Sequence, residues 1–493
     1  MRILLVYPQY PDTFWSFKHA LRFISKKASN PPLGLLTVAA LLPREWEQRL
    51  ADLNVRPLGD NDLLWADYVL ISAMTVQRAS ARQIIDRCRN LGVKTVAGGP
   101  LFTTCPEEFP DVNHLVLDEA EVTLGMFLAD LQAGSPKPVY TSKIRADITQ
   151  TPPPRWDLVD CSKYASLSLQ YSRGCPFNCD FCNITMLYGH QPRTKELGQV
   201  LAELDAIYAL GWRGSVFMVD DNFIGNKQKL KQEILPALID WMARRRHPFN
   251  FYTQVSINLA DDEVLMELMV RAGFDTVFVG IETPNEASLA ECSKVQNKQR
   301  DLVAAVKKIQ HQGLQVQGGF IVGFDSDPQS IFVNQIEFIQ KSGIVTAMVG
   351  LLSALRGTGL YERLQKEKRI LKEGTGNNTD GTLNFIPKMP PATLLSGYRQ
   401  ILATIYEPEF YYRRIREFLR EYRPRPVRIR RLHLSDIEAF FGSILILGII
   451  GKERAHYWKL LGWSLVKNPR AFPVAVQYAI YGFHFRKVLA ETV

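Results

Sequence analysis

The sequence predicts an α/β protein in which a doubly wound domain precedes a partial parallel barrel of six strand–helix units and a helical C-terminal extension. Three observations predict this order. Short runs of Val, Ile and Leu alternate with helix-like stretches up to residue 135, the alternation resumes at residue 166, and the composition changes after about residue 390. Continuous aliphatic runs between glycine or polar residues are typical of buried parallel strands. The 493 residues also exceed what one hydrophobic core usually organises.

Composition excludes several classes of protein. With 46% hydrophobic and 22% charged residues, the chain is globular rather than disordered. Its seven cysteines are an odd number in a long chain, which disfavours a disulfide scaffold. The apolar run after Met1 is too short for the core of a signal peptide. We therefore expect a cytoplasmic protein.

The first domain is expected over residues 1–135, with strands at 3–6, 67–72, 93–97 and 114–117. In a doubly wound, Rossmann-like sheet the ligand lies beyond the carboxyl ends of the strands. The segments just after those ends contain Ser72, Gly98 and Gly99 and the acidic stretch 118–121. Small residues there would allow a large ligand to approach the backbone closely.

A proline-rich linker is expected over 136–165, and the second domain over 166–355. The extension then covers 356–493. Helical patterns such as 197–210 and 301–312 separate the strands of the second domain, and the site of such a barrel is expected at their carboxyl ends. Its predicted strands are 167–171, 215–219, 249–256, 276–281, 316–322 and 347–352.

Three cysteines follow the first strand of the second domain. Cys175, Cys179 and Cys182 are separated by three and then two residues, so one tight loop can bring them onto three irons of a cubane cluster. The fourth iron would then be open to the amino and carboxylate groups of S-adenosylmethionine. A zinc site would usually show a second pair of Cys or His at matching spacing, and none accompanies this loop. Three buried, inert cysteines are the other alternative.

This Cys-x3-Cys-x-Phe-Cys spacing resembles the signature of the radical S-adenosylmethionine enzymes. The resemblance implies a [4Fe–4S] cluster on the three cysteines, S-adenosylmethionine as cosubstrate and Phe181 near its adenine. Acceptors follow later strands: Asp220, Asp221 and Asn222 could bind the methionine amino group, and Glu282 could accept from ribose hydroxyls. Helix capping is the alternative role of such residues.

The doubly wound first domain resembles that of the cobalamin-binding subgroup of the same superfamily. The resemblance implies a corrinoid in the sheet crevice, lined by Ser72, Gly98 and Gly99. One departure is that many such domains carry Asp-x-His-x-x-Gly, whereas this chain has Asp52-Leu-Asn-Val-Arg-Pro and no histidine between residues 20 and 113. The cobalt would then lack a protein imidazole. A domain that binds another ligand, or only supports the barrel, is the alternative.

Over roughly residues 2–420 the chain is similar to the group that includes the hopanoid C-2 methylases. The resemblance implies a C-methyltransferase acting on an unactivated carbon of a lipid or polycyclic substrate, with a reductant such as flavodoxin or ferredoxin. One alternative is a radical cyclase or oxidoreductase like the anaerobic tetrapyrrole ring cyclase. Another is a non-catalytic corrinoid-binding or sensor protein. Methylthiotransferases are disfavoured because the other four cysteines are isolated.

The extension carries most of the positive charge. Nine arginines lie between Tyr411 and His433, and the largely apolar stretch 440–450 follows them. A spanning helix needs about 20 apolar residues, so this stretch is not a transmembrane segment. The arginine cluster beside apolar and aromatic segments instead favours a peripheral site at the inner face of an anionic membrane. A helical subdomain with a solvated basic face is the alternative. We expect no nucleic-acid partner, since no recognised RNA-modification domain accompanies the charge.

Overall fold

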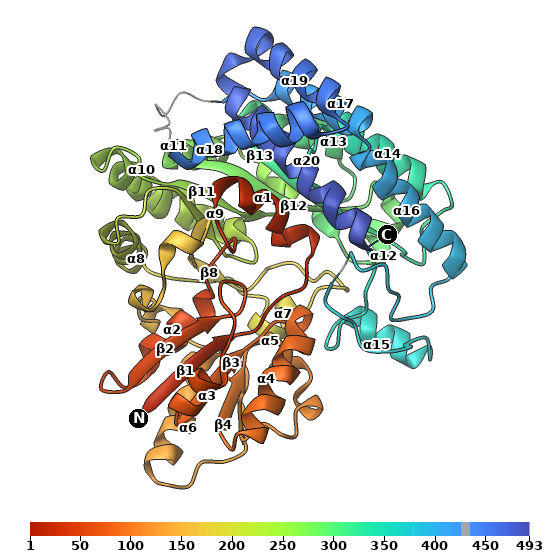
Figure 1. Ribbon diagram of the computed structural model, residues 1–493. Helices are drawn as coiled ribbons and strands as arrows, with labels where there is room; N and C mark the ends of the chain where they lie inside the picture. The colour runs from red at the N-terminus through yellow and green to blue at the C-terminus, as the bar shows by residue number, and fades with distance from the viewer. Residues whose placement is uncertain (378, 425–433, 493) are drawn as a thin grey trace.

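The computed structural model describes residues 1–377, 379–424 and 434–492. Two parallel six-stranded sheets follow one another along the chain, and helices of the C-terminal part pack beyond the second sheet (Figure 1). The predicted architecture is confirmed. Four of the arginines singled out in the sequence lie outside the described residues, namely Arg425, Arg428, Arg430 and Arg431.

The first sheet is wound on both faces. Helices α2 (Leu33–Leu41) and α6 (Ala120–Gln132) bury aliphatic side chains against one face. Helices α3 (Asp60–Trp65), α4 (Arg78–Asn90) and α5 (Pro100–Thr104) cover the other. The strand order is β2-β1-β3-β4-β5-β6, with β1 Arg2–Tyr7, β2 Glu47–Asp52, β3 Tyr68–Ser72, β4 Lys94–Gly98, β5 His114–Val116 and β6 Val139–Tyr140.

The two edge strands of this sheet, β2 and β6, are absent from the strands that the sequence pattern predicts. Most side chains of β2 are exposed or half-buried, because only β1 pairs with it. No continuous aliphatic run therefore marks it. Strand β6 has two residues and extends the sheet into the segment 136–165.

The second sheet is an open parallel barrel. Its strand order β14-β13-β12-β11-β10-β7 leaves β7 and β14 at the two edges, so the barrel does not close. Outward-facing residues such as Val216, Phe251 and Val277 join the surrounding helices in one large core. The strands are β7 Ser166–Leu169, β10 Ser215–Met218, β11 Asn250–Val255, β12 Phe274–Glu282, β13 Gln315–Val322 and β14 Ala347–Leu351. The longer helices are α8 Leu197–Ala209, α10 Leu235–Arg244, α11 Glu263–Ala272, α13 Leu302–His311 and α14 Ile331–Ser342.

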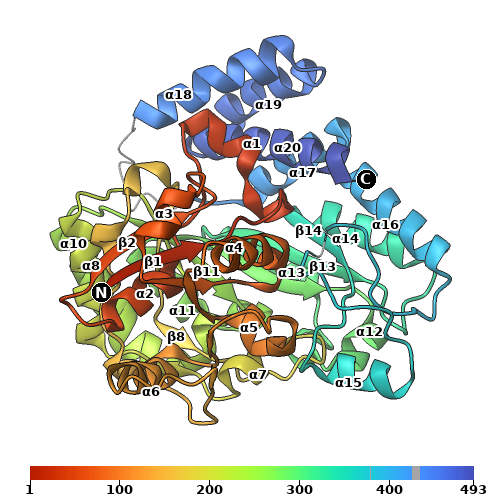
Figure 2. The same ribbon diagram turned by 60° about the horizontal axis from the view of Figure 1, so that its bottom comes forward.

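The C-terminal helices pack against a segment from the other end of the chain. Residues 8–32 leave the first sheet after β1 and form helix α1 (Lys18–Leu21) beside α20 (Phe472–Thr492), as Figures 1 and 2 show. Phe14 stacks on Phe485 with ring centroids 4.1 Å apart. The other helices here are α15 Gly359–Lys366, α16 Pro391–Tyr406, α17 Pro408–Glu421, α18 Leu434–Ser443 and α19 Arg454–Lys467. Among the described residues, we find no helix that combines the length and the apolar character needed to cross a bilayer.

Candidate functional site

The cysteine loop begins directly after the first strand of the barrel. Strand β8 (Ser172–Arg173) leads into it, and helix α7 (Ile184–Tyr188) follows it. Gly174 has a φ of +97°, and a Cβ there would lie 2.9 Å from the carbonyl oxygen of Gln191. Only glycine fits this turn without strain. The turn places Cys175 at the carboxyl end of the strands.

The three thiol sulfurs of the cysteine loop do not form a site for a single metal ion. The sulfurs of Cys175, Cys179 and Cys182 do not all lie within 4.8 Å of one another. Zn–S bonds of about 2.3 Å would place tetrahedral thiolates about 3.8 Å apart. A cubane cluster binds each cysteine through a different iron and keeps the sulfurs further apart. The loop therefore disfavours the zinc alternative.

Two aspartates after β10 hold this loop. The carboxylate of Asp220 accepts hydrogen bonds from the backbone amides of Ser172 and Tyr171, and that of Asp221 accepts from Gly174 at 2.9 Å. Burial raises the pKa of Asp220 to about 7 and also raises the pKa of Asp221. Both side chains position the backbone that leads to Cys175. Their expected contact with the methionine amino group stays a prediction.

Asn222 is held by the next strand. Its Oδ1 accepts from the backbone amide of Ser256 at 3.2 Å, and its Nδ2 donates to the Ser256 hydroxyl at 3.3 Å. The side chain is buried and ties the loop after β10 to the end of β11. Its predicted contact with S-adenosylmethionine is likewise untested.

Glu282 ends β12 next to a residue that sequence reasoning missed. The ammonium of Lys294 donates to Glu282 Oε1 at 2.7 Å, and both side chains are buried. The backbone of Glu282 has a φ of +63°, at a register shift between β12 and β13. A Cβ on Gly280 would lie 2.3 Å from Glu282 Oε1 and 2.9 Å from Lys294 Nζ. The position of Glu282 directly after a predicted strand was the signal for the carboxylate, but nothing in the sequence marked its partner twelve residues later.

Lys294 also faces the cysteines. Burial raises the pKa of each of the three thiols, to about 12 for Cys182, and the Lys294 ammonium opposes this effect at all three. A cation beside thiolates is favourable when they bind a metal cluster. Lys294 Nζ also lies 6.0 Å from the ring centroid of Phe181.

Polar atoms without partners lie beside the cysteine loop. Gln296 donates to the Cys179 sulfur at 3.8 Å, but its buried Oε1 has no protein partner. Asn297 donates to the carbonyl oxygens of Gly280 and Ile281, and its Oδ1 is also buried without a partner. Buried polar atoms usually have a partner. The free Gln296 Oε1 beside Cys179 therefore fits a polar cosubstrate.

The predicted corrinoid residues lie together at the carboxyl ends of the central strands β3 and β4 of the first sheet. Ser72 and Gly98 are paired at the ends of β3 and β4, and Gly99 follows with a φ of +88°. A Cβ on Gly99 would lie 2.6 Å from the Ser72 hydroxyl oxygen. Glycine is therefore required beside the Ser72 side chain, and the Gly99 backbone carries no side chain of its own at the predicted crevice. The C-terminal part also reaches these strand ends, since a Cβ on Gly376 would lie 2.8 Å from the Val76 amide.

The stretch without the usual histidine is held by protein contacts. Asp52 ends β2, accepts from the Asn54 amide at 2.9 Å, and accepts from the Tyr164 hydroxyl at 2.9 Å. Asn54 Oδ1 accepts from the backbone amide of Tyr10 at 3.0 Å. Asn54, which stands where the histidine would be, thus ties together the loops after β1 and β2.

An ion-pair network joins the first sheet to the cysteine loop. Arg173, just before Gly174, contacts Glu119 at 2.7 Å and Glu121 at 2.9 Å, both of which follow β5. Arg193 contacts the same Glu119 oxygen at 2.9 Å. Only 1% of the Glu119 side chain and 11% of the Arg173 side chain are exposed. The carboxyl ends of the two sheets, one with the predicted corrinoid residues and one with the cysteines, are thereby held against each other.

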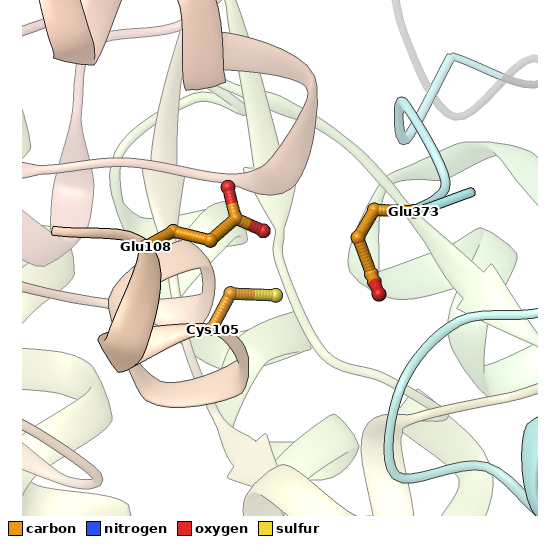
Figure 3. Close-up of side chains that lie close together, drawn as sticks. All are labelled: Cys105, Glu108 and Glu373. Atoms are coloured by element: carbon orange, nitrogen blue, oxygen red, sulfur yellow. The ribbon is translucent and has the colours of Figure 1, made fainter.

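A third group of candidate ligands lies at the interface with the C-terminal part. Cys105 and Glu108 come from the first domain and Glu373 from the segment after α15, and the three side chains point toward one another (Figure 3). Two arginines accompany them, because Arg78 lies 3.5 Å from Glu108 and Arg356 lies 2.8 Å from Glu373. The carboxylates are already neutralised, so the group is an interdomain ion-pair cluster rather than a metal centre.

Comparison with known proteins agrees with this geometry. The chain matches the B12 binding domain over residues 23–127, the Radical SAM superfamily over 169–339 and a domain of unknown function, DUF4070, over 358–493. It is 41% identical to an uncharacterized methyltransferase of Synechocystis sp., covering 98% of this chain and 91% of that protein. It is 34% identical to the hopanoid C-2 methylase of Rhodopseudomonas palustris, covering 95% and 90%. The chain belongs to the cobalamin-dependent radical S-adenosylmethionine methyltransferases.

Solved structures share the fold of this methyltransferase. The cobalamin-dependent S-adenosylmethionine radical enzyme OxsB, with aqua-cobalamin bound, has a TM-score of 0.65 and 15% identity, covering 100% of this chain and 84% of that one. The methyltransferase TsrM of Kitasatospora setae, with cobalamin and a [4Fe–4S] cluster bound, has a TM-score of 0.64 and 14% identity, covering 93% and 98%. The predicted cofactors, a [4Fe–4S] cluster, S-adenosylmethionine and cobalamin, are those of the family. Membership favours the methyltransferase over the cyclase and over a non-catalytic corrinoid protein.

Proposed function

We propose that this enzyme transfers a methyl group to an unactivated carbon of a hydrophobic lipid or polycyclic substrate. The observation that carries the proposal is the row of aromatic side chains on the inner face of the barrel. Phe217 of β10 stacks on Tyr252 of β11 with ring centroids 4.6 Å apart, and Trp15 meets Phe278 of β12 at 5.3 Å. Phe217, Tyr252 and Phe278 alternate with the outward-facing residues of their strands.

The inner rings differ in exposure from the outer core. Phe251 and Val277 are fully buried under the helices, whereas their neighbours Tyr252 and Phe278 remain partly exposed and Trp15 is 38% exposed. Aromatic side chains that stay accessible inside a barrel suit a large apolar ligand. The names of the relatives support this substrate class, since one is a hopanoid methylase and another, 26% identical, is a bacteriochlorophyllide d methyltransferase of Chlorobaculum tepidum.

The roles of the site residues are part of this proposal. Cys175, Cys179 and Cys182 hold the cluster, and Phe181 and Glu282 contact the cosubstrate. When bound, the cluster and S-adenosylmethionine supply hydrogen abstraction from the substrate, and cobalamin supplies the methyl group. Ser72, Gly98 and Gly99 line the proposed corrinoid crevice. The chain's own task is to align these groups and exclude water from the reacting carbon.

The test is anaerobic reconstitution with iron, sulfide and hydroxocobalamin, followed by assay for 5'-deoxyadenosine and S-adenosylhomocysteine. We expect both products, and a substrate that gains the mass of one methylene unit in a screen of polycyclic lipids and tetrapyrroles. Cys179→Ala is expected to abolish 5'-deoxyadenosine formation because it removes a cluster ligand. Cys161→Ala, which changes a cysteine outside the loop, is the matched control. Product formation only with polar substrates would contradict the proposed substrate class.

Radical S-adenosylmethionine enzymes need a reductant, and a flavodoxin or ferredoxin is the proposed donor. A hydrophobic substrate also suggests where the enzyme works. We propose peripheral binding to the inner face of a membrane, where such molecules are concentrated. The supporting observation is the positive charge of the C-terminal part, where exposed Lys452, Arg454, Lys459, Lys467 and Arg470 outnumber Asp436, Glu438 and Glu453.

A further inference from the structure

The helices α18 and α19, with the π-helical segment Ile444–Ile450 between them, carry an unusual apolar surface. In Figure 2 they project from the rest of the molecule, on the side away from α6 and α15. Their large apolar side chains are between 43% and 80% exposed. We call this surface the apolar ridge; its residues are Leu434, Ile437, Phe441, Leu445, Ile449, Ile450, Trp458, Leu465 and Val466.

The part of the apolar ridge on residues 434–450 is one face of a continuous helical stretch. Ile437, Phe441, Leu445 and Ile449 are spaced by four residues, which places them on the same side. The opposite side, at residues 439, 443 and 447, is buried against the C-terminal helices, and the Ser443 hydroxyl lies 2.8 Å from that of Tyr457. The inner side is thus well packed. The outer side carries these exposed apolar side chains together with one exposed carboxylate, that of Glu438.

Basic groups accompany the apolar ridge. Lys452 and Arg454 lie at the turn between the two helices, and Lys459 lies on α19 next to Trp458. Glu453, at the same turn, is already paired with Arg486 at 2.7 Å. A groove of about 660 Å³ opens at the other end of α19, lined by Arg420, Arg423, Lys467 and Arg470 together with Tyr422 and Trp463. Within the part of the chain that the structure describes, no acidic side chain lines this groove.

An apolar strip flanked by cations and aromatic rings matches an anionic bilayer. The stretch 434–450 has 17 residues, fewer than the roughly 20 needed to span the hydrocarbon core, so it can only lie in the interface. Cations near such a surface are attracted by anionic phosphates. A second copy of this chain would instead bring equal positive charges together.

We propose that the apolar ridge inserts into the headgroup region of an anionic membrane and that the basic groove binds lipid phosphates. The inference rests on the proposed function, because the membrane would deliver the hydrophobic substrate. Phe441 and Leu445 enter the acyl boundary, and Lys467 and Arg470 stay at the phosphate level. The barrel and the first sheet then remain in water above the bilayer.

The test is sedimentation of the full-length enzyme with vesicles of phosphatidylcholine containing phosphatidylglycerol, and with vesicles of phosphatidylcholine alone. We expect binding to the anionic vesicles that weakens as salt is raised. The double variant Phe441→Ser/Leu445→Ser is expected to lower the vesicle partition coefficient by about a hundredfold. The matched control is Val264→Ser/Val333→Ser, which changes side chains of similar exposure, 61% and 50%, on helices of the barrel.

The basic groove has its own variant. Lys467→Glu/Arg470→Glu is expected to reduce binding to anionic vesicles at low salt by about tenfold or more and to leave binding to neutral vesicles unchanged. Lys341→Glu, which reverses an exposed charge on α14, is the control. Equal binding of the groove variant and the wild type would overturn the assignment of the phosphate site.

Three results would overturn the apolar ridge as a membrane surface. The first is that the wild type does not bind anionic vesicles, and the second is that the Phe441→Ser/Leu445→Ser variant binds them as well as the wild type does. The third is that light scattering shows a dimer for the wild type and a monomer for this variant. Methylation of a detergent-dissolved substrate separates this outcome from failure of the proposed function. The ridge variant keeps that activity if the proposed function is right, whatever the vesicles show.

Discussion

Arg173 offers a direct test of how the two halves of the site are aligned. Its guanidinium contacts Glu119 at 2.7 Å and Glu121 at 2.9 Å, across the boundary between the first sheet and the cysteine loop. Replacing it with methionine keeps the aliphatic volume but leaves Glu121 buried without its arginine partner. Breaking a buried ion pair from one side typically costs about 3–5 kcal/mol. A domain of the barrel's size shifts its melting temperature by about 2–4 °C per kcal/mol.

We therefore expect Arg173→Met to lower the melting temperature of the apoprotein by about 6 °C or more in scanning calorimetry. The matched control is Arg89→Met. Arg89 also contacts two carboxylates, Asp86 at 3.1 Å and Asp111 at 2.9 Å, but its side chain is 52% exposed. Exposed pairs contribute about 0–1 kcal/mol, so this variant should melt close to the wild type.

The pH dependence makes the test sharper. Burial alone would raise the pKa of Glu121, but Arg173 lowers it below its ordinary value. The pair therefore stabilises the fold above that ordinary pKa, and its contribution is lost as the pH falls through the lowered value. The difference between Arg173→Met and the wild type should shrink toward pH 4. Equal melting of Arg173→Met and Arg89→Met at neutral pH would refute the reasoning.

Three further predictions concern the cofactors and the fold. Gly99→Ala should lower the amount of cobalamin bound after reconstitution, as measured by absorbance. The added Cβ would lie 2.6 Å from the Ser72 hydroxyl oxygen, at a residue with a φ of +88°. A normal cobalamin content would count against the proposed crevice. Lys294→Met should retain the cluster less well and shift the electron paramagnetic resonance spectrum of the cluster. The reason is that Glu282 and the thiolates lose a buried cation, which lies 2.7 Å from Glu282 in the wild type. An unchanged spectrum would contradict this role of Lys294. Burial raises the pKa of Asp327 to about 6, so the stability that this residue contributes should be lost as the pH rises from about 4 to 6, and the melting temperature should fall over that range. Asp327→Asn should make this fall in melting temperature smaller. An unchanged fall would exclude Asp327 as its source.

The chemistry of the cluster was readable in the sequence because it lies in one short segment. Cys175, Cys179 and Cys182 fall within eight residues, and their spacing depends only on the local loop. The central strands were equally visible, because strands buried on both faces read as continuous aliphatic runs. Strand β2 was missed for the opposite reason, since an edge strand with exposed side chains has no such run.

The tertiary structure decided everything that depends on residues far apart in the chain. Only folding brings Lys294 to Glu282, and only folding gives Asp220 its partners in the cysteine loop, 48 residues earlier. It also pairs Glu119 with Arg173, and it places residues 8–32 against the last helix. The sequence by itself therefore determined the family, the cofactors and the central strands, whose signals are local spacing and periodicity. How the two sheets face each other, and which side chains remain exposed on α18 and α19, depend on packing between distant segments, and no local pattern encodes that packing.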